Sequence, residues 1–294
     1  MTAAEEGLLL LCCQLGDSGS KPLTMARFRD LGNRVRAAAP DWDLLSDLSR
    51  RDLARLGCPE AQIDQILLLL DRRSRLEDYL AAAARRQITA VTRISPAYPR
   101  RVIRKMQLSS PPILFALGDL SLLERPSVAV IGSRKLLPEN EVFARDAGRK
   151  AAEEGLVLVS GNAKGADRTA QEACLDAGGS CVVFVADRLM DHTPHDRILY
   201  ISEDGYELPF SPARALHRNA LIHMQGDRTL AVQCTHGKGG TWAGCLDNLR
   251  HGWSPLFVYD DGSPGMQALM EQGAAGIKQL TTISGLTPPQ ISLF

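Results

Sequence analysis

The sequence lacks any apolar run close to the ~20 residues that a membrane-spanning helix needs, and it has no net charge. Its 34 Lys and Arg residues balance 34 Asp and Glu residues. This balance argues against a surface that coats a polyanion and leaves only local basic patches. The short apolar segment at 8–13 has neither a basic leader nor a small-residue cleavage site, so we expect no signal peptide. These absences favour a cytoplasmic protein with no membrane partner.

Cysteine is present in no pattern typical of disulfides or zinc. The seven cysteines are scattered and odd in number, which suggests reduced thiols. The closest approach to a ligand set matches no structural zinc spacing; it consists of Cys234, His236, Cys245 and His251. We therefore expect buried thiols, ordinary histidines and no metal.

Residues 1–86 are expected to be helical throughout. Apolar residues recur at helical spacing over four stretches, namely 8–15, 25–38, 42–56 and 62–84. The Leu56-Gly57-Cys58 turn resembles that of helix–hairpin–helix modules, whose backbone N–H groups can contact DNA phosphates. A glycine that simply ends a helix is the favoured interpretation. We predict a small all-helical domain of SAM or helix–hairpin–helix type.

A basic linker is predicted at 87–110. Between 93 and 105 there is no acidic residue, and the basic ones are Arg93, Arg100, Arg101, Arg104 and Lys105. Prolines at 96 and 99 indicate that the segment starts as a loop. Two interpretations stay open, a solvated surface and a basic rim beside an anion site.

Strands alternate with helices from residue 111 onward. Short apolar runs predict strands at 113–116, 128–131, 156–159, 181–185, 198–202, 230–233 and 256–259. Helices are predicted at 166–177, 213–225, 241–250 and 264–272. This alternation implies a Rossmann-like α/β domain over 111–282, with a parallel sheet covered by helices on both faces. A flexible tail, 283–294, follows.

Small polar turns follow three of these strands. The first two are Gly132-Ser133-Arg134 and Ser160-Gly161, which leads to Lys164, and Gly239-Gly240-Thr241 repeats the pattern later. Ligands collect at the carboxyl ends of parallel strands. There, glycines let the backbone approach an anion, and a helix N-terminus supplies unpaired N–H groups. Because Arg134 and Lys164 add full charges, the sequence predicts an anion or phosphate site for a nucleotide or nucleic acid.

The same turns exclude familiar cofactor sites. Gly132-Ser133-Arg134 does not satisfy GxGxxG, and the later glycine-rich turn lacks the GxxxxGKT spacing. Related folds with a GG-x-GT turn cleave nucleoside monophosphates with a Glu three residues past the Thr. Here Gly239-Gly240-Thr241 is followed by Trp242, Ala243 and Gly244, so that carboxylate is missing. We expect no cofactor and no enzyme activity, whereas a nucleotide-binding sensor or nucleotide-processing protein of that superfamily remains the alternative.

The order of the motifs resembles the DNA-processing protein A (DprA/Smf) family. These motifs are YP (98–99), PPILFALGD (111–119), AVIGSR (129–134), SGNAKGAD (160–167), SE (202–203), RN (218–219) and the glycine-rich turn. The resemblance implies a Rossmann-like, dimeric, non-enzymatic protein that binds single-stranded DNA. It also implies a RecA-type recombinase as partner, loaded onto DNA during DNA uptake in natural transformation.

The resemblance also implies roles for single residues. Arg134 becomes a phosphate contact. A second lip of the pocket comprises Ser160, Gly161, Lys164, Gly165 and Asp167, and a third comprises Arg218 and Asn219. The chain departs from the family pattern at Gln171, where relatives usually have His, and at Gln233, where an acidic residue is usual. We expect a diverged member.

Binding of a single strand without sequence preference also needs flat surfaces for the bases. The best candidates are Phe210, Trp242 and Tyr206. Each could equally belong to the core.

The last residues resemble the short peptide by which bacterial replication and repair proteins bind the sliding clamp. After Pro288-Pro289, the chain ends in Gln290-Ile291-Ser292-Leu293-Phe294. In such peptides the Gln makes polar contacts, here Gln290, and the apolar pair, here Leu293 and Phe294, fills a pocket. The sequence predicts a clamp-binding tail; the alternative is a tail that folds back and buries Leu293 and Phe294.

Overall fold

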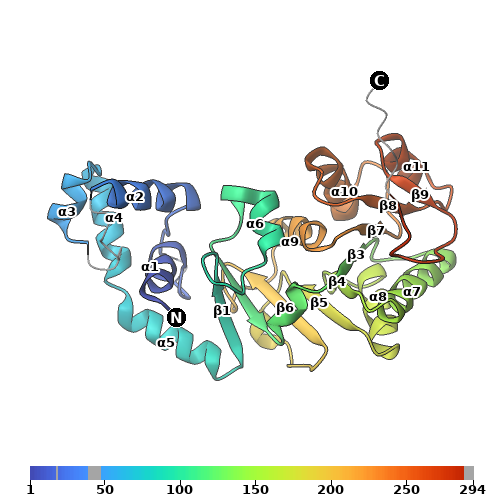
Figure 1. Ribbon diagram of the computed structural model, residues 1–294, viewed down its shortest axis with the longest axis horizontal. Helices are drawn as coiled ribbons and strands as arrows, with labels where there is room; N and C mark the ends of the chain where they lie inside the picture. Colours follow the sequence, from blue (N-terminus) through green and yellow to red (C-terminus); the bar gives the residue numbers. More distant parts are fainter. Residues whose placement is uncertain (18, 39–47, 288–294) are drawn as a thin grey trace. The chain divides into compact units, whose positions relative to one another are not determined.

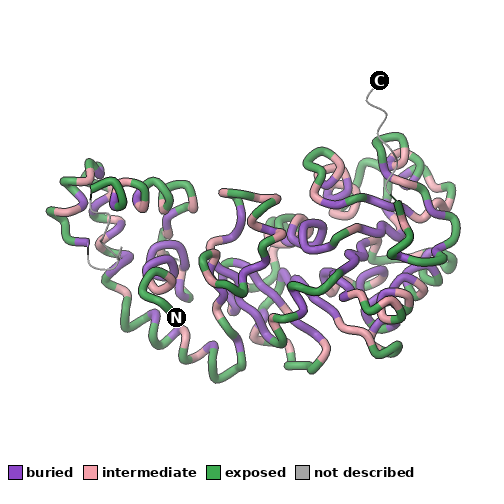
Figure 2. The backbone as a smooth tube through the Cα atoms, viewed as in Figure 1, coloured by how far each residue is buried: buried purple, intermediate pink, exposed green. Residues whose placement is uncertain are grey.

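The computed structural model describes residues 1–17, 19–38 and 48–287, and the chain divides into two compact units. Unit 1 comprises 1–117, 189–191 and 202–208, and unit 2 comprises 118–188, 192–201 and 209–294. Each unit has its own buried core (Figure 2). The predicted clamp-binding residues Gln290, Leu293 and Phe294 lie outside the described residues, as does the start of the helix predicted at 42–56.

The described part of unit 1 begins with helices, as predicted. They are α1 (Ala3–Cys12), α2 (Met25–Ala38), α3 (Arg50–Arg55), α4 (Glu60–Leu70) and α5 (Arg73–Ala84). The single helix predicted at 62–84 is wrong, because the chain breaks at Asp71-Arg72 into α4 and α5. At this break the Arg72 guanidinium donates to the Cys13 carbonyl at the end of α1 (3.0 Å) and to the Ser20 hydroxyl (2.8 Å).

The Gly57 turn ends α3. Gly57 has φ +72°, and the Cys58 N–H donates to the Leu53 carbonyl at 3.1 Å, which is the hydrogen bond of a glycine helix cap. The Arg34 guanidinium donates to the Leu56 and Gly57 carbonyls, both at 3.0 Å. The capping interpretation is therefore confirmed.

Residues 87–110 contain regular structure that the sequence did not indicate. Strand β1 (Ile88–Thr92) pairs antiparallel with β2 (Ile113–Leu117), with Ile88 opposite Leu117. Between them, helix α6 (Arg100–Met106) starts directly after Pro99, where a proline is well tolerated. A 3₁₀ turn, Gln107–Ser109, follows α6.

Unit 2 is the Rossmann-type part of the α/β fold. Its strands are β3 (Ser127–Ile131), β4 (Val157–Ser160), β5 (Ser180–Phe184), β6 (Ile198–Glu203), β7 (Thr229–Ala231), β8 (Leu256–Tyr259) and β9 (Ala275–Ile277). Its helices are α7 (Pro138–Glu153), α8 (Ala166–Asp176), α9 (Pro212–Gln225), α10 (Gly239–His251) and α11 (Pro264–Glu271). Each neighbouring pair of these strands is parallel. Helices α7 and α8 lie on one side of the strands and α9 and α10 on the other (Figure 1).

The strand order places a reversal of chain direction next to β3. The order is β6-β5-β4-β3-β7-β8-β9, so the chain first adds strands on one side of β3 and then returns through α9 to add β7 on the other. The crossovers that leave β3 and β7 diverge at this point. Such a topological switch point opens a crevice at the carboxyl ends of the two strands.

Candidate functional site

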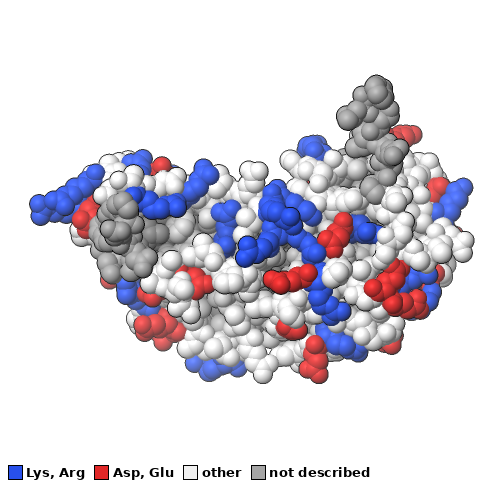
Figure 3. Space-filling model, viewed as in Figure 1, with Lys and Arg blue, Asp and Glu red and all other residues white. Residues whose placement is uncertain are grey.

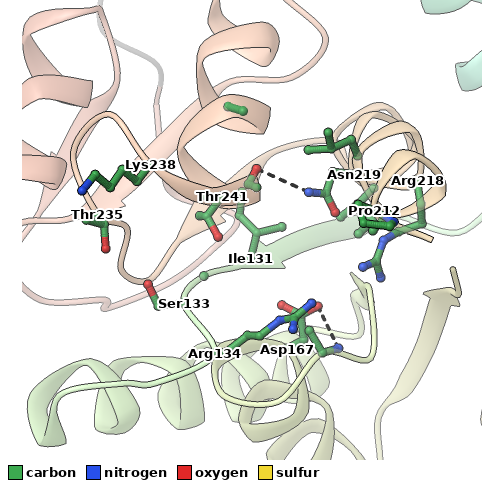
Figure 4. Close-up of a pocket in the computed structure, with 18 of the residues that line it drawn as sticks. Ile131, Ser133, Arg134, Asp167, Pro212, Arg218, Asn219, Thr235, Lys238 and Thr241 are labelled. Atoms are coloured by element: carbon green, nitrogen blue, oxygen red, sulfur yellow. Dashed lines mark hydrogen bonds between the residues drawn. The ribbon is translucent and has the colours of Figure 1, made fainter. Parts of the chain in front are cut away.

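A pocket of about 790 Å³ lies at the switch point. It is lined by the turns after β3, β4 and β7 and by the start of α9 (Figure 4). Of the predicted site residues, it brings together Gly132, Ser133, Arg134, Asp167, Arg218, Asn219, Gly239, Gly240 and Thr241. The other predicted residues do not line it; they are Ser160, Gly161, Lys164 and Gly165.

Gly165 lies where the turns after β3 and β4 touch. It has φ +80°, and a Cβ there would collide with the Ser133 carbonyl and lie 2.7 Å from the Arg134 carbonyl oxygen. The Ala166 N–H donates to the Ser133 carbonyl at 3.2 Å. The glycine thus lets one turn rest on the backbone of the other, and this contact positions Arg134.

Asp167 and Arg218 hold the turn after β4 from inside. The Asp167 carboxylate accepts from the N–H groups of Gly161 (3.0 Å) and Ala163 (3.3 Å). The buried Arg218 guanidinium donates to the carbonyls of Gly161 and Phe184, the latter at 2.9 Å. Burial raises the pKa of Asp167, against the opposing effects of Arg218 and the two N–H groups. Both side chains therefore line the pocket while they also support its wall.

Two further hydroxyls in these turns have internal partners. The buried Ser160 hydroxyl accepts from the Gln171 side-chain amide, so the residue that departs from the family pattern supports the same turn. The Ser133 hydroxyl donates to the Gln233 carbonyl at 3.1 Å and ties the end of β3 to the segment after β7. Lys164 is exposed on the β4 turn, beside the pocket lining.

The exposed cations of the pocket lining are Arg134 and Lys238. They lie on separate turns (Figure 4). The Arg134 guanidinium makes no hydrogen bond or ion pair within the part of the chain that the structure describes, and it favours the charged form of Asp167. Lys238 was missed in the sequence, although its place directly before the first helical residue of a glycine-rich turn was the available signal.

Helix α10 points its N-terminus at this pocket. It begins at Gly239 after Lys238, and no side chain caps it. The N–H groups of its first turn, from Gly239 to Thr241, therefore have no partner within the helix, and the helix dipole gives this end a partial positive charge. The Asn219 side-chain amide donates to the Gly240 carbonyl at 3.4 Å and holds α9 against the turn. The arrangement is suited to an anion.

The three aromatic candidates have different surroundings. Tyr206 belongs to the core of unit 1, where its hydroxyl donates to the Tyr79 carbonyl at 3.0 Å and its ring packs on that of Tyr79. Trp242 is half-buried beside the pocket lining, edge-on to His236. Phe210 lines the pocket and is 53% exposed. The suggestion that Tyr206 stacks on bases is therefore wrong, because its ring is enclosed.

A second group of basic residues lies on α6 in unit 1. Val102 is buried and anchors the helix, whereas Arg100 and Arg104 are exposed. Basic side chains gather where α6 lies (Figure 3).

Two searches of the described residues found no candidate. No group of three or more His, Cys, Asp or Glu residues in this part of the chain could hold a metal ion. No helix within it combines the length and apolarity needed to span a membrane. All seven cysteines are buried and free.

Comparison with known proteins gives the family. Residues 89–286 match the model of the DNA recombination-mediator protein A family. The DNA processing protein DprA of Bacillus subtilis is 25% identical over 259 residues, which is 82% of this chain and 84% of that protein. DprA of Streptococcus pneumoniae is 34% identical over 107 residues, 33% of this chain but only 37% of that protein's length.

Solved structures agree with this match. An X-ray structure of S. pneumoniae DprA superposes with a TM-score of 0.66 at 22% identity, over 90% of this chain and 92% of that chain. A structure of Helicobacter pylori DprA, described for that protein's single-stranded DNA binding mode, gives a TM-score of 0.54 at 28% identity, over 66% of this chain and 92% of that one. With a family match that covers most of its length, the chain belongs to the DNA recombination-mediator protein A family.

Proposed function

We propose that this protein binds single-stranded DNA in the pocket of unit 2 and mediates recombination by presenting that strand to a recombinase. The observation that supports it most directly is the meeting of Arg134, Lys238 and the uncapped α10 N-terminus around one pocket of about 790 Å³. Phosphates of a strand would contact these groups. Within the α/β domain proposed at 111–282, the first and third turns supply the contacts, and Gly161, Gly165, Asp167 and Arg218 fix the turns.

A titration of Arg134→Ala tests this function. A labelled oligo-dT is titrated with the protein at two salt concentrations, and anisotropy gives Kd. Loss of one charge-assisted phosphate contact should weaken binding about tenfold. It should also reduce the slope of log K against log salt by about 0.7.

Lys135→Ala is the matched control. Lys135 is the next residue, equally exposed, but outside the pocket lining. We expect its affinity to stay within about twofold of wild type, because a solvated charge without a fixed contact contributes little. An Arg134→Ala protein that binds like wild type would remove the central part of the proposal.

A small-nucleotide sensor is the second candidate, because a pocket of about 790 Å³ is also of a size that encloses one small ligand. Free mononucleotides added to the same titration separate the two. Tight mononucleotide binding without strand binding would replace the DNA proposal.

We further propose a RecA-type recombinase as partner and a homodimer as the active form, in DNA uptake. Family membership supports both. The recombinase partner predicts that wild-type protein shortens the lag of recombinase ATPase on coated single strands and that Arg134→Ala does not. Sedimentation velocity measures the oligomeric state; a monomer at micromolar concentration would contradict the dimer.

The tail is proposed to bind the sliding clamp through Gln290, Leu293 and Phe294. The supporting feature is the sequence after Pro288-Pro289. Deletion of the last five residues should abolish co-elution with the clamp and leave the Kd for single strands unchanged. Co-elution that survives the deletion would exclude this role.

A further inference from the structure

The pocket has two chemically different walls. The turns after β3 and β7 present Arg134, Lys238 and backbone N–H groups, whereas the start of α9 presents apolar groups. The apolar wall comprises Phe210, Pro212, Ala215 and Leu216. None of these side chains has a hydrogen-bonding atom.

Two residues of this wall expose large apolar side chains to solvent. Phe210 is 53% and Leu216 is 54% exposed, and both line the pocket. A Cβ built on Gly240 would lie 3.9 Å from Leu216 Cδ2. The apolar wall therefore begins directly beside the α10 N-terminus, where an anion would be held.

The backbone that bears Phe210 is fixed by hydrogen bonds. The Arg214 guanidinium donates to the Pro209 carbonyl at 2.9 Å and to the Ala186 carbonyl at 2.7 Å. The Ser211 hydroxyl accepts from the Arg214 N–H at 3.2 Å and caps α9. Phe210 thus projects from an ordered helix start. A ring held in place loses little conformational entropy when a flat ligand stacks on it.

From this arrangement we infer that the apolar wall is a nucleobase subsite, in which Phe210 stacks on a base while the facing turns bind the adjacent phosphates. The inference rests on the proposed single-stranded DNA function and specifies how each nucleotide is divided between the two walls. An apolar wall offers no donors or acceptors for base edges, so the subsite accepts any base and favours larger rings.

The test compares an oligo-dT with an abasic strand of equal length that retains every phosphate. Wild type should bind the abasic strand about tenfold more weakly than oligo-dT, and Phe210→Ala should bind oligo-dT about tenfold more weakly than wild type does. On the abasic strand, wild type and Phe210→Ala should agree within about twofold. Phe210→Trp should retain the preference for bases.

Three controls make the outcomes distinct. Arg134→Ala should weaken binding to both strands by the same factor. Val142→Ala removes another exposed apolar side chain, 60% exposed and outside the pocket lining, and should change neither affinity. Equal melting temperatures should show that Phe210→Ala is folded, as expected for an exposed residue.

Equal loss on both strands, or no loss, for Phe210→Ala would overturn the base subsite and leave strand binding intact. If wild type binds neither strand, the proposed function fails, and the subsite fails with it.

Discussion

Exposed arginines lie in two regions of this molecule, and the two regions present them differently. In unit 2, Arg134 follows β3 on a turn that rests on Gly165 and is tied to the segment after β7 through Ser133. In unit 1, Arg100 and Arg104 lie one helical turn apart on α6, which Val102 anchors. The first region fixes a charge by buried contacts, whereas the second displays charges on an exposed helix.

This difference predicts different behaviour toward a polyanion. A charge fixed beside free N–H groups can bind one phosphate at a defined position, so its removal should matter for any strand length. Exposed charges on a helix face attract a strand without a fixed geometry, and they are screened by salt. Like charges four residues apart on a helix also destabilise it slightly. The predictions below test this contrast.

Gly165→Ala should have the largest effect. The new Cβ would meet the Ser133 carbonyl at a backbone with φ +80°, so we expect a loss of about 3 kcal/mol in the free energy of unfolding, measured by urea denaturation. Gly178→Ala is the control, because Gly178 has φ +86° but nothing within 4 Å of a Cβ. It should cost about 1 kcal/mol, from the backbone conformation alone. Equal costs would show that contact between the two turns is unimportant.

Lys238→Ala should come next, with about fivefold weaker binding of oligo-dT. Because Lys238 and Arg134 lie on separate turns, the double variant should lose the product of the two single factors. Lys278→Ala, at an 85% exposed side chain outside the pocket lining, should have no effect. A double variant no weaker than Arg134→Ala would mean that both cations bind the same phosphate.

The Arg100→Ala/Arg104→Ala protein should show a smaller effect. We expect binding about two- to threefold weaker on long strands at low salt, and unchanged on short ones. Arg145→Ala/Arg149→Ala removes the same charge from α7, where the guanidinium groups pair with Glu141 and Glu153. If this control weakens binding equally, only net charge matters and α6 has no special role.

The smallest expected effects concern pH. Burial raises the pKa of Asp167, so its contribution to stability is complete below the unfolded-state pKa and is lost as pH rises through the folded-state pKa. A hydrogen bond from His192 lowers the pKa of Asp187, so its contribution is present above the unfolded-state pKa and is lost as pH falls through the folded-state pKa.

Unfolding free energies from pH 3 to 7 can separate these two carboxyl groups. The difference between wild type and Asp167→Asn should shrink as pH rises above about 4, whereas that for Asp187→Asn should shrink as pH falls below about 4. Slopes of the same sign would contradict this pairing of burial against hydrogen bonding.

Local sequence predicted the pocket residues better than their roles. Gly132-Ser133-Arg134 and Gly239-Gly240-Thr241 do line the pocket, because a glycine-bearing turn between strand and helix is a local feature. Arg218 was predicted as a third lip, and the structure buries its guanidinium against the Gly161 and Phe184 carbonyls. Tyr206 was offered as a stacking surface but lies in the core of unit 1. Burial depends on neighbours far away in the sequence, which no local pattern specifies.

The sequence by itself determined the alternation of strands and helices in unit 2, the glycine turns and the residues on them. Short buried β-branched runs and amphipathic helices depend on nearest neighbours along the chain. Only the tertiary structure decided that β7 pairs with β3 and thereby opens the switch-point pocket. It also decided that Phe210 and Leu216 face the cationic turns across that pocket. Strand order is set by how helices pack over both faces of a sheet, a property of the whole domain.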